Sequence, residues 1–142
     1  MGREENETKK QYLRGYERAC RKQRRVEEEL ETIRNEKILP GITADGMPHG
    51  SRKCNDLSEY MVRLLEIETE YEEEKLKLLE TRKRIVDSIE ELHSENEKDV
   101  LKARYIDLLS WEAICQRMHY EWAQVHRFHA NALQHLKIND TQ

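Results

Sequence analysis

The chain has 142 residues, of which 38% are charged, 37% hydrophobic and 6% aromatic, and its formal net charge is −4. No apolar run approaches the ~20 residues of a membrane span, and no apolar segment follows the N-terminus as in a secretory signal. We therefore expect a cytoplasmic protein that makes no contact with a membrane. Abundant Glu, Lys, Arg and Leu with only five Gly and two Pro predict an all-α fold.

The three cysteines, Cys20, Cys54 and Cys115, are far apart and form no CxxC or Cys/His pattern. An odd number at such spacing fits a reducing compartment and predicts neither a disulfide framework nor a zinc site.

A predicted loop at 39–55 separates two long helices. Both prolines and three of the five glycines lie between Leu39 and Gly50. Before the loop, apolar residues recur in steps of three and four from about residue 8 to residue 38, and Gly15 is the weak point of that helix. After it, with Asp56 as the expected cap, the seventh-residue repeat runs through Leu57, Leu64, Tyr71, Leu78, Ile85 and Leu92.

Opposite charges indicate how the two helices pair. Residues 8–39 carry a net charge of +4 (ten basic minus six acidic), and residues 40–93 carry −5 (eight basic minus thirteen acidic). Folding back at the loop brings the basic cluster Arg18–Arg25 opposite the acidic run Glu66–Glu74. We therefore expect a long antiparallel, coiled-coil-like hairpin over 8–93, after a tail at 1–7, and interpret the basic cluster as ion-pairing and not as a nucleic-acid patch.

The segment 94–138, followed by a tail at 139–142, reads as three short helices. It holds both tryptophans, the only phenylalanine and four of the six histidines. Ser110 is the expected start of the middle helix, and the last helix is expected at about 121–136. Two short helices joined by a tight turn form a helix-turn-helix. Its expected core is Tyr105, Leu108, Leu109, Ile114, Met118, Val125 and Phe128.

The stretch from Leu101 to Leu133 resembles the helix-turn-helix of sigma-70 region 4. The whole chain is similar to phage and prophage sigma-like regulators of the ArpU, RinA and Xpf type, which have a helical N-terminal part and a region-4-like end. The resemblance implies double-stranded DNA as partner, contact with RNA polymerase, and a place in the cytoplasm of a bacterial host. It implies base-reading positions at Trp122, Ala123, Gln124, His126 and Arg127, and backbone contacts from Lys102 and Asn131.

Two positions of the turn depart from that family. His119 stands where Gly usually takes a left-handed conformation, and Glu121 stands where Ser or Thr caps the helix. Residues 94–142 carry six basic and seven acidic residues, a net charge of −1. Since phosphate neutralisation drives much of DNA affinity, we expect a single copy to bind weakly and a dimer or a polymerase partner to compensate.

Nothing in the sequence predicts an enzyme. There is no P-loop, nucleophile elbow or paired acid and base, so we expect no catalytic residues, no cofactor and no small-molecule substrate. His126 and His129 lie one turn apart but have no third ligand at a suitable spacing, so no metal site is expected.

Two hypotheses stay open at this point. In the first, the chain is a phage-type transcriptional regulator whose hairpin serves self-association or polymerase contact. In the second, it is a coiled-coil adaptor or structural protein whose C-terminal domain docks a protein. The sequence also leaves open whether the hairpin closes within one chain or is swapped between two.

Overall fold

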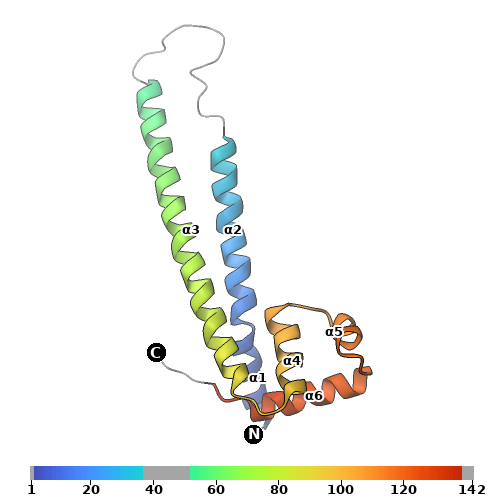
Figure 1. Ribbon diagram of the computed structural model, residues 1–142. Coiled ribbons are helices and arrows are strands. Elements are labelled where there is room, and N and C mark those ends of the chain that lie inside the picture. Colours follow the sequence, from blue (N-terminus) through green and yellow to red (C-terminus); the bar gives the residue numbers. More distant parts are fainter. Residues whose placement is uncertain (1, 37–51, 139–142) are drawn as a thin grey trace. The chain divides into compact units, whose positions relative to one another are not determined.

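The computed structural model describes residues 2–36 and 52–138 (Figure 1). Within these ranges every regular element is a helix, which confirms the all-α prediction. None of these helices is both long and apolar enough to cross a membrane. Contacts divide the chain into two compact units, residues 1–20 with 77–142, and residues 21–76.

The N-terminal helix is longer than expected and is interrupted once. Helix α1 spans Gly2–Leu13, so residues 2–7, expected to be a tail, are helical. Helix α2 spans Gly15–Asn35, and the break falls at Arg14, beside the glycine that weakens the helix. Backbone hydrogen bonds of 2.9 and 3.0 Å still link Arg14 to Lys10 and to Arg18, so helical hydrogen bonding continues across the break.

Helix α3 spans Arg52–Glu90 and begins four residues before the expected cap. Asp56 therefore lies inside the helix and does not cap it. The helix begins before Leu57, the first residue of the seventh-residue repeat. Most of the loop expected at 39–55 falls on 37–51, outside the described residues.

In the unit of residues 21–76, α2 and α3 run antiparallel (Figure 1). Val26, Leu30 and Ile33 of α2 are buried, and Leu64 and Tyr71 of the α3 repeat are half-buried. Val26, Leu30 and Ile33 form the buried face of α2, and they follow the steps of three and four that the sequence predicts.

Ion pairs join the two helices of this unit. They are Lys22 with Glu74 at 3.2 Å, Arg34 with Glu68 at 3.2 Å and Arg63 with Glu36 at 3.7 Å. Of the basic cluster, Lys22 forms an ion pair with Glu74, which is only 7% exposed. The two exposed pairs contribute little stability and mainly favour the antiparallel register.

The other unit has one core, formed by both ends of the sequence. Its fully buried side chains come from α1, from the last turns of α3 and from the C-terminal helices: Leu13, Ile85, Ile89, Val100, Leu101, Ile114, Val125, Ala132 and Leu133. The core thus crosses residue 93, where the sequence predicts a domain boundary. The base of the hairpin and the C-terminal helices form one compact body.

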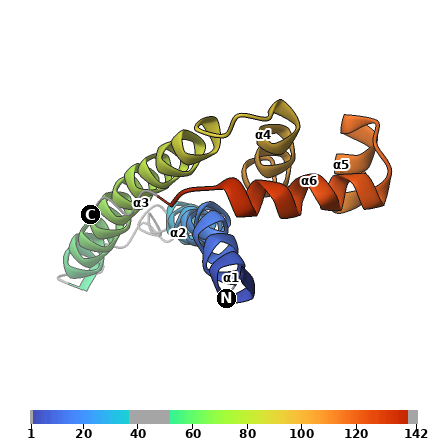
Figure 2. The same cartoon turned by 90° about the horizontal axis from the view of Figure 1, so that it is seen from below.

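The C-terminal helices are α4 (Glu95–Leu101), α5 (Trp111–Met118) and α6 (Trp122–His135), and α6 packs against both α4 and α5 (Figure 2). The chain leaves α4 through a single π-helical segment, η2 (Lys102–Ile106). Leu108 follows in a left-handed conformation with φ 58° and is 43% exposed. Its predicted place in the core is therefore wrong, because the π-helix and the left-handed residue turn its side chain outward.

Candidate nucleic-acid interface

Helices α5 and α6 form a helix-turn-helix at the predicted position. The Ser110 hydroxyl accepts a hydrogen bond of 3.2 Å from the Ala113 N–H, which confirms Ser110 as the cap of α5. His119 ends α5 with φ 60° and ψ 36°, the left-handed conformation that the resemblance to sigma-70 region 4 implies there. Helix α6 follows Glu121, whose side chain makes no capping hydrogen bond.

Apolar contacts fix the angle between these helices. Ile114 and Val125 are completely buried, and Met118 and Phe128 pack against the same core. The Tyr120 ring packs edge-on against the Phe128 ring, with 5.0 Å between the ring centroids, and this contact links the turn to α6. The short helices therefore have little freedom to shift relative to each other.

The outward face of α6 carries several predicted contact residues. Trp122, Ala123, Arg127 and Asn131 are exposed, whereas Gln124 is half-buried at the edge of this face. Ala130 and Gln134 are exposed on the same face, although the sequence prediction omitted them. The helical spacing that relates Ala123 to Arg127 could have identified both.

His126 is placed differently from the expectation. Its ring lies 4.3 Å from that of Trp111 and 4.4 Å from that of Trp122, measured between ring centroids. Its Nε2 is buried and has no hydrogen-bond partner among the described residues. This geometry does not favour a base-reading role for His126, because the imidazole contacts both indole rings and its Nε2 is buried.

Trp122 covers this stack and is itself 53% exposed. Trp111, His126 and Trp122 form an aromatic cluster. Arg104 packs against it, with its guanidinium carbon 4.6 Å from the centroid of the Trp111 ring. His129 meets Trp111 edge-on at 4.8 Å. Trp122 therefore both packs against His126 and presents an exposed aromatic surface at the start of α6.

His129 is the buried residue that packs beneath the aromatic cluster, against Trp111. Its Nε2 lies 2.8 Å from the Tyr105 hydroxyl. Burial, assisted by the nearby cations Lys10 and Arg104, lowers the pKa of His129 to about 4, and burial raises the pKa of Tyr105. Both side chains are therefore neutral near pH 7, so the core under α6 holds no uncompensated charge.

Several cations of this region are already engaged. Lys102, the predicted backbone contact, pairs with Glu90 and thereby lowers the pKa of that carboxyl. Arg117 pairs with Asp107 at 2.6 Å. On α6, Arg127 donates to the Gln124 side-chain oxygen at 3.1 Å, so both side chains must separate before each can bond to two atoms of a base.

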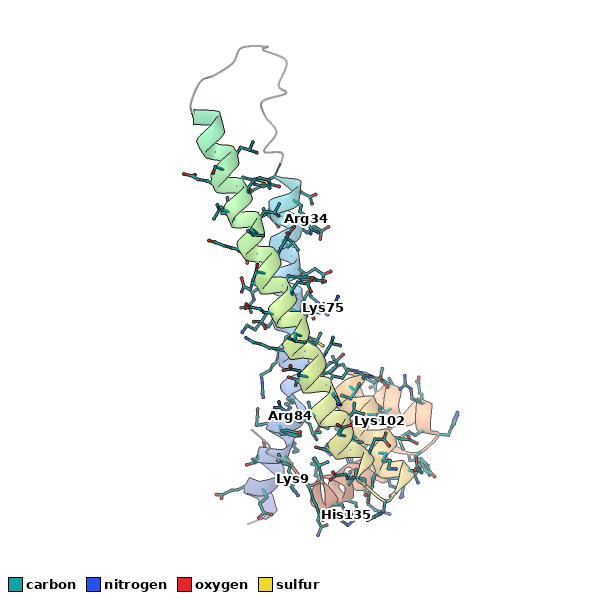
Figure 3. All side chains as sticks on the ribbon, turned by 60° about the vertical axis from the view of Figure 1, so that its left-hand side comes forward. Lys9, Arg34, Lys75, Arg84, Lys102 and His135 are labelled. Carbon is teal, nitrogen blue, oxygen red and sulfur yellow. The ribbon has the colours of Figure 1, made fainter. Side chains whose placement is uncertain are left out.

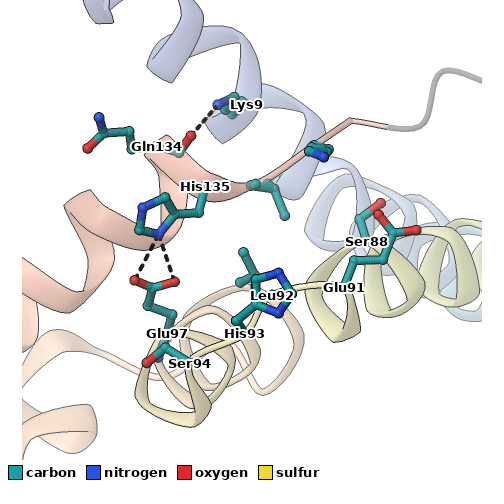
Figure 4. A pocket seen from close by; sticks show the side chains of 11 residues that line it. Lys9, Ser88, Glu91, Leu92, His93, Ser94, Glu97, Gln134 and His135 are labelled. Atoms are coloured by element: carbon teal, nitrogen blue, oxygen red, sulfur yellow. Dashed lines mark hydrogen bonds and ion pairs between the residues drawn. The ribbon is translucent and has the colours of Figure 1, made fainter.

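A groove of about 640 Å³ opens where α1, α3, α4 and α6 meet (Figure 4). Within it, His135 Nδ1 lies 3.0 and 3.1 Å from the two Glu97 oxygens, and the Lys9 ammonium donates to the carbonyls of Leu133 and Gln134 at 2.7 and 3.3 Å. These polar groups satisfy one another and tie the helix ends together. In the described parts of the chain no three His, Cys, Asp or Glu side chains converge to hold a metal ion.

Comparison with known proteins adds no relative. No protein-family model, no curated protein and no solved structure matches this chain.

Proposed function

We propose that the chain is a sequence-specific DNA-binding transcriptional regulator of phage or prophage genes, acting in the cytoplasm of a bacterial host. Helix α6 enters the major groove with Ala123, Gln124 and Arg127 at the base edges and Trp122 at the rim. Asn131 lies one turn further along, toward the DNA backbone. The observation that carries this proposal is the helix-turn-helix itself, in which α5 ends at a left-handed His119 and α6 exposes Arg127, Asn131 and Gln134 along one face.

The charges define the expected strength of binding. Arg127 is bonded to an uncharged side chain and is exposed, so it can move to a guanine edge. Lys102 must leave Glu90 before it can bind a phosphate. With so few available cations, a single copy binds weakly and depends on a second copy or on RNA polymerase.

The hairpin is the second functional part of this proposal. Its exposed apolar side chains on α3, among them Val62, Leu65 and Leu76, suit an arm that binds either RNA polymerase or another copy of the chain. On this view the C-terminal helices read DNA, and the hairpin supplies the contact that makes a weak reader effective.

Selection from a random duplex library with the full chain tests DNA recognition. We expect one sequence to be enriched, and Arg127→Ala to weaken its binding by ~10-fold or more. Lys137→Ala is the matched control, because it removes a cation outside the exposed row of α6, and its effect should stay below ~3-fold. If no sequence is enriched, the proposed function is wrong.

A second candidate function is that of an adaptor whose C-terminal helices dock a protein. It is favoured by the 53% exposed Trp122 and by the ion pairing of Lys102 and Arg117. If purified RNA polymerase binds the chain with an affinity that Trp122→Ala lowers and Arg127→Ala leaves unchanged, while no DNA binds, this candidate replaces the first.

A further inference from the structure

Helix α3 has a second apolar stripe within the unit of residues 21–76. The first stripe, with Leu64 and Tyr71, faces α2 and is half-buried. The second contains Val62, Leu65 and Leu76, which are 54%, 65% and 58% exposed. At 100° of rotation per residue the two stripes are roughly 150° apart around the helix, so α2 cannot cover both.

The spacing of the second stripe is that of a coiled-coil seam. The positions that would face a partner helix are Val62, Leu65, Thr69, Glu72 and Leu76, in alternating steps of three and four. A helix with apolar seams on two opposite faces is typical of a helix packed between two others. Helix α2 packs against the first seam. No helix of the described residues packs against the second seam, which is exposed.

The surface between the leucines is hollow. A shallow depression of about 470 Å³ is lined by Leu65, Glu68, Thr69, Glu72, Glu73 and Leu76. These six residues form two overlapping four-residue holes of the kind that receives a side chain from a facing helix. Thr69 is small, so an incoming Leu or Met side chain can fit between Leu65 and Leu76.

The charges beside the seam define the partner. One flank consists of Glu59, Glu66 and Glu73, each seven residues from the next and all exposed. The other flank holds Glu68, which accepts a hydrogen bond from Arg34, and the exposed Lys75 (Figure 3). Flanking positions of a seam face the flanking positions of the partner helix, so the row of glutamates requires cations opposite it.

A second copy of this chain is a poor occupant. Antiparallel pairing of two α3 seams that sets Leu65 against Leu76 also brings Glu66 beside Glu73 of the other copy. Parallel pairing sets Glu72 against Glu72 in the centre of the seam. The antiparallel arrangement offsets this repulsion in part, because Glu68 then lies beside Lys75 of the other copy, whereas the parallel one places two carboxylates inside the seam. Both arrangements therefore juxtapose like charges, which opposes association.

We infer that this surface of α3 docks a basic amphipathic helix of another protein. The partner helix lays its apolar side chains along Val62, Leu65 and Leu76, and inserts one of them into the depression at Thr69. Its Lys or Arg residues face Glu59, Glu66 and Glu73. This inference rests on the proposed role of the hairpin as an interaction arm, and it selects a foreign partner over a second copy. It is independent of DNA binding by α6.

Two synthetic helices test the inference with the full chain. Both have three heptads with Leu at the seam positions, and the flanking positions are Lys in one peptide and Glu in the other. By fluorescence anisotropy at physiological salt we expect the Lys peptide to bind at least ~10-fold more tightly than the Glu peptide. Equal affinities, or no binding of either peptide, would overturn the inference.

Substitutions then locate the site. Leu65→Glu with Leu76→Glu should lower the affinity for the Lys peptide at least ~10-fold, and circular dichroism should be unchanged because both side chains are exposed. Glu66→Lys with Glu73→Lys should reverse the preference between the peptides. The control Glu28→Lys with Glu29→Lys makes the same change of charge at exposed positions of α2 and should keep the original preference.

Failure of the charge reversal would contradict the inference even if the leucine variant bound poorly. Sedimentation of the unmodified chain provides a separate check. If it forms a dimer that Leu65→Glu with Leu76→Glu converts to a monomer, the second copy is the occupant and the inference is wrong. Neither result depends on whether the chain binds DNA, so failure here is distinguishable from failure of the DNA-binding proposal.

Discussion

The Tyr105 hydroxyl lies 2.8 Å from Nε2 of His129, and both side chains are buried between η2 and α6. This contact links the helix that precedes the helix-turn-helix to the middle of the proposed recognition helix. Since the rings also stack at 5.8 Å, a change at either residue should be transmitted to the orientation of α6.

The first prediction concerns pH. Because the pKa of His129 is lowered from 6.5 to about 4 in the folded chain, the unfolded state takes up the proton first as the pH falls. The stabilisation is therefore fully present above pH 6.5 and is lost as the pH falls toward 4, by up to about 3 kcal/mol. Urea unfolding at a series of pH values between about 7 and about 5 measures this slope.

His129→Gln removes the titrating group but keeps a polar side chain for Tyr105, so the slope above about pH 5 should flatten. His93→Gln is the control, because His93 is exposed and should leave the slope as it is. An unchanged slope in His129→Gln would assign the pH dependence to another group.

The second prediction concerns the turn before α6. His119 holds φ 60°, which carries a backbone penalty of about 1 kcal/mol for a residue with a Cβ. His119→Gly should raise the free energy of unfolding by roughly 0.5–1 kcal/mol, as measured by urea denaturation. His119→Ala also removes the imidazole but keeps the Cβ, so it should give no gain. If Ala and Gly stabilise equally, the imidazole and not the backbone is the source of the strain.

The third prediction concerns Lys102, which pairs with Glu90. If Lys102 binds phosphate in the complex, Glu90→Gln should strengthen DNA binding several-fold, because the lysine no longer has to leave a carboxylate. Lys102→Ala should weaken binding to all sequences about equally and lower the salt slope by about 1. Fluorescence anisotropy over a salt series measures both effects. Weaker binding of Glu90→Gln would show that the ion pair is needed to hold the domain in shape.

The fourth prediction concerns the division of labour on α6. Arg127→Ala and Gln124→Ala should each relax the choice of base at one position of the site, since each side chain can bond to two atoms of one base. His126→Ala should act differently. It removes the ring between Trp111 and Trp122, so it should lower stability by roughly 1–3 kcal/mol and leave the preferred sequence unchanged. A new base preference in His126→Ala would contradict the stacked placement.

Local signals were the predictable part of this structure. The Ser110 cap and the helical spacing of Ile114, Met118 and Val125 each depend on residues a few positions apart, whereas the left-handed His119 was implied only by the resemblance to sigma-70 region 4. The sequence therefore predicted the start of α5 at Ser110, and both bounds of α6, 121–136, to within one residue.

Features that depend on tertiary contacts were not predictable in the same way. The repeat at Ile85 and Leu92 predicts a buried face, but it does not say that the α4 and α6 side chains Val100 and Leu133 cover it. The position of His126 between two tryptophans likewise arises from packing, whereas the outward turn of Leu108 follows from the π-helical segment and its left-handed backbone. A periodic pattern says which side of a helix is buried, whereas the covering element is set by the whole core.

The central claim is that α6 reads a DNA sequence, and its most direct test is the affinity of the full chain for an enriched duplex and for an unrelated duplex of equal length. At physiological salt we predict a ratio of at least ~100-fold, and a salt slope of roughly −2 to −3 from the few available cations. Equal affinities for the two duplexes, or no binding to either, would contradict the claim.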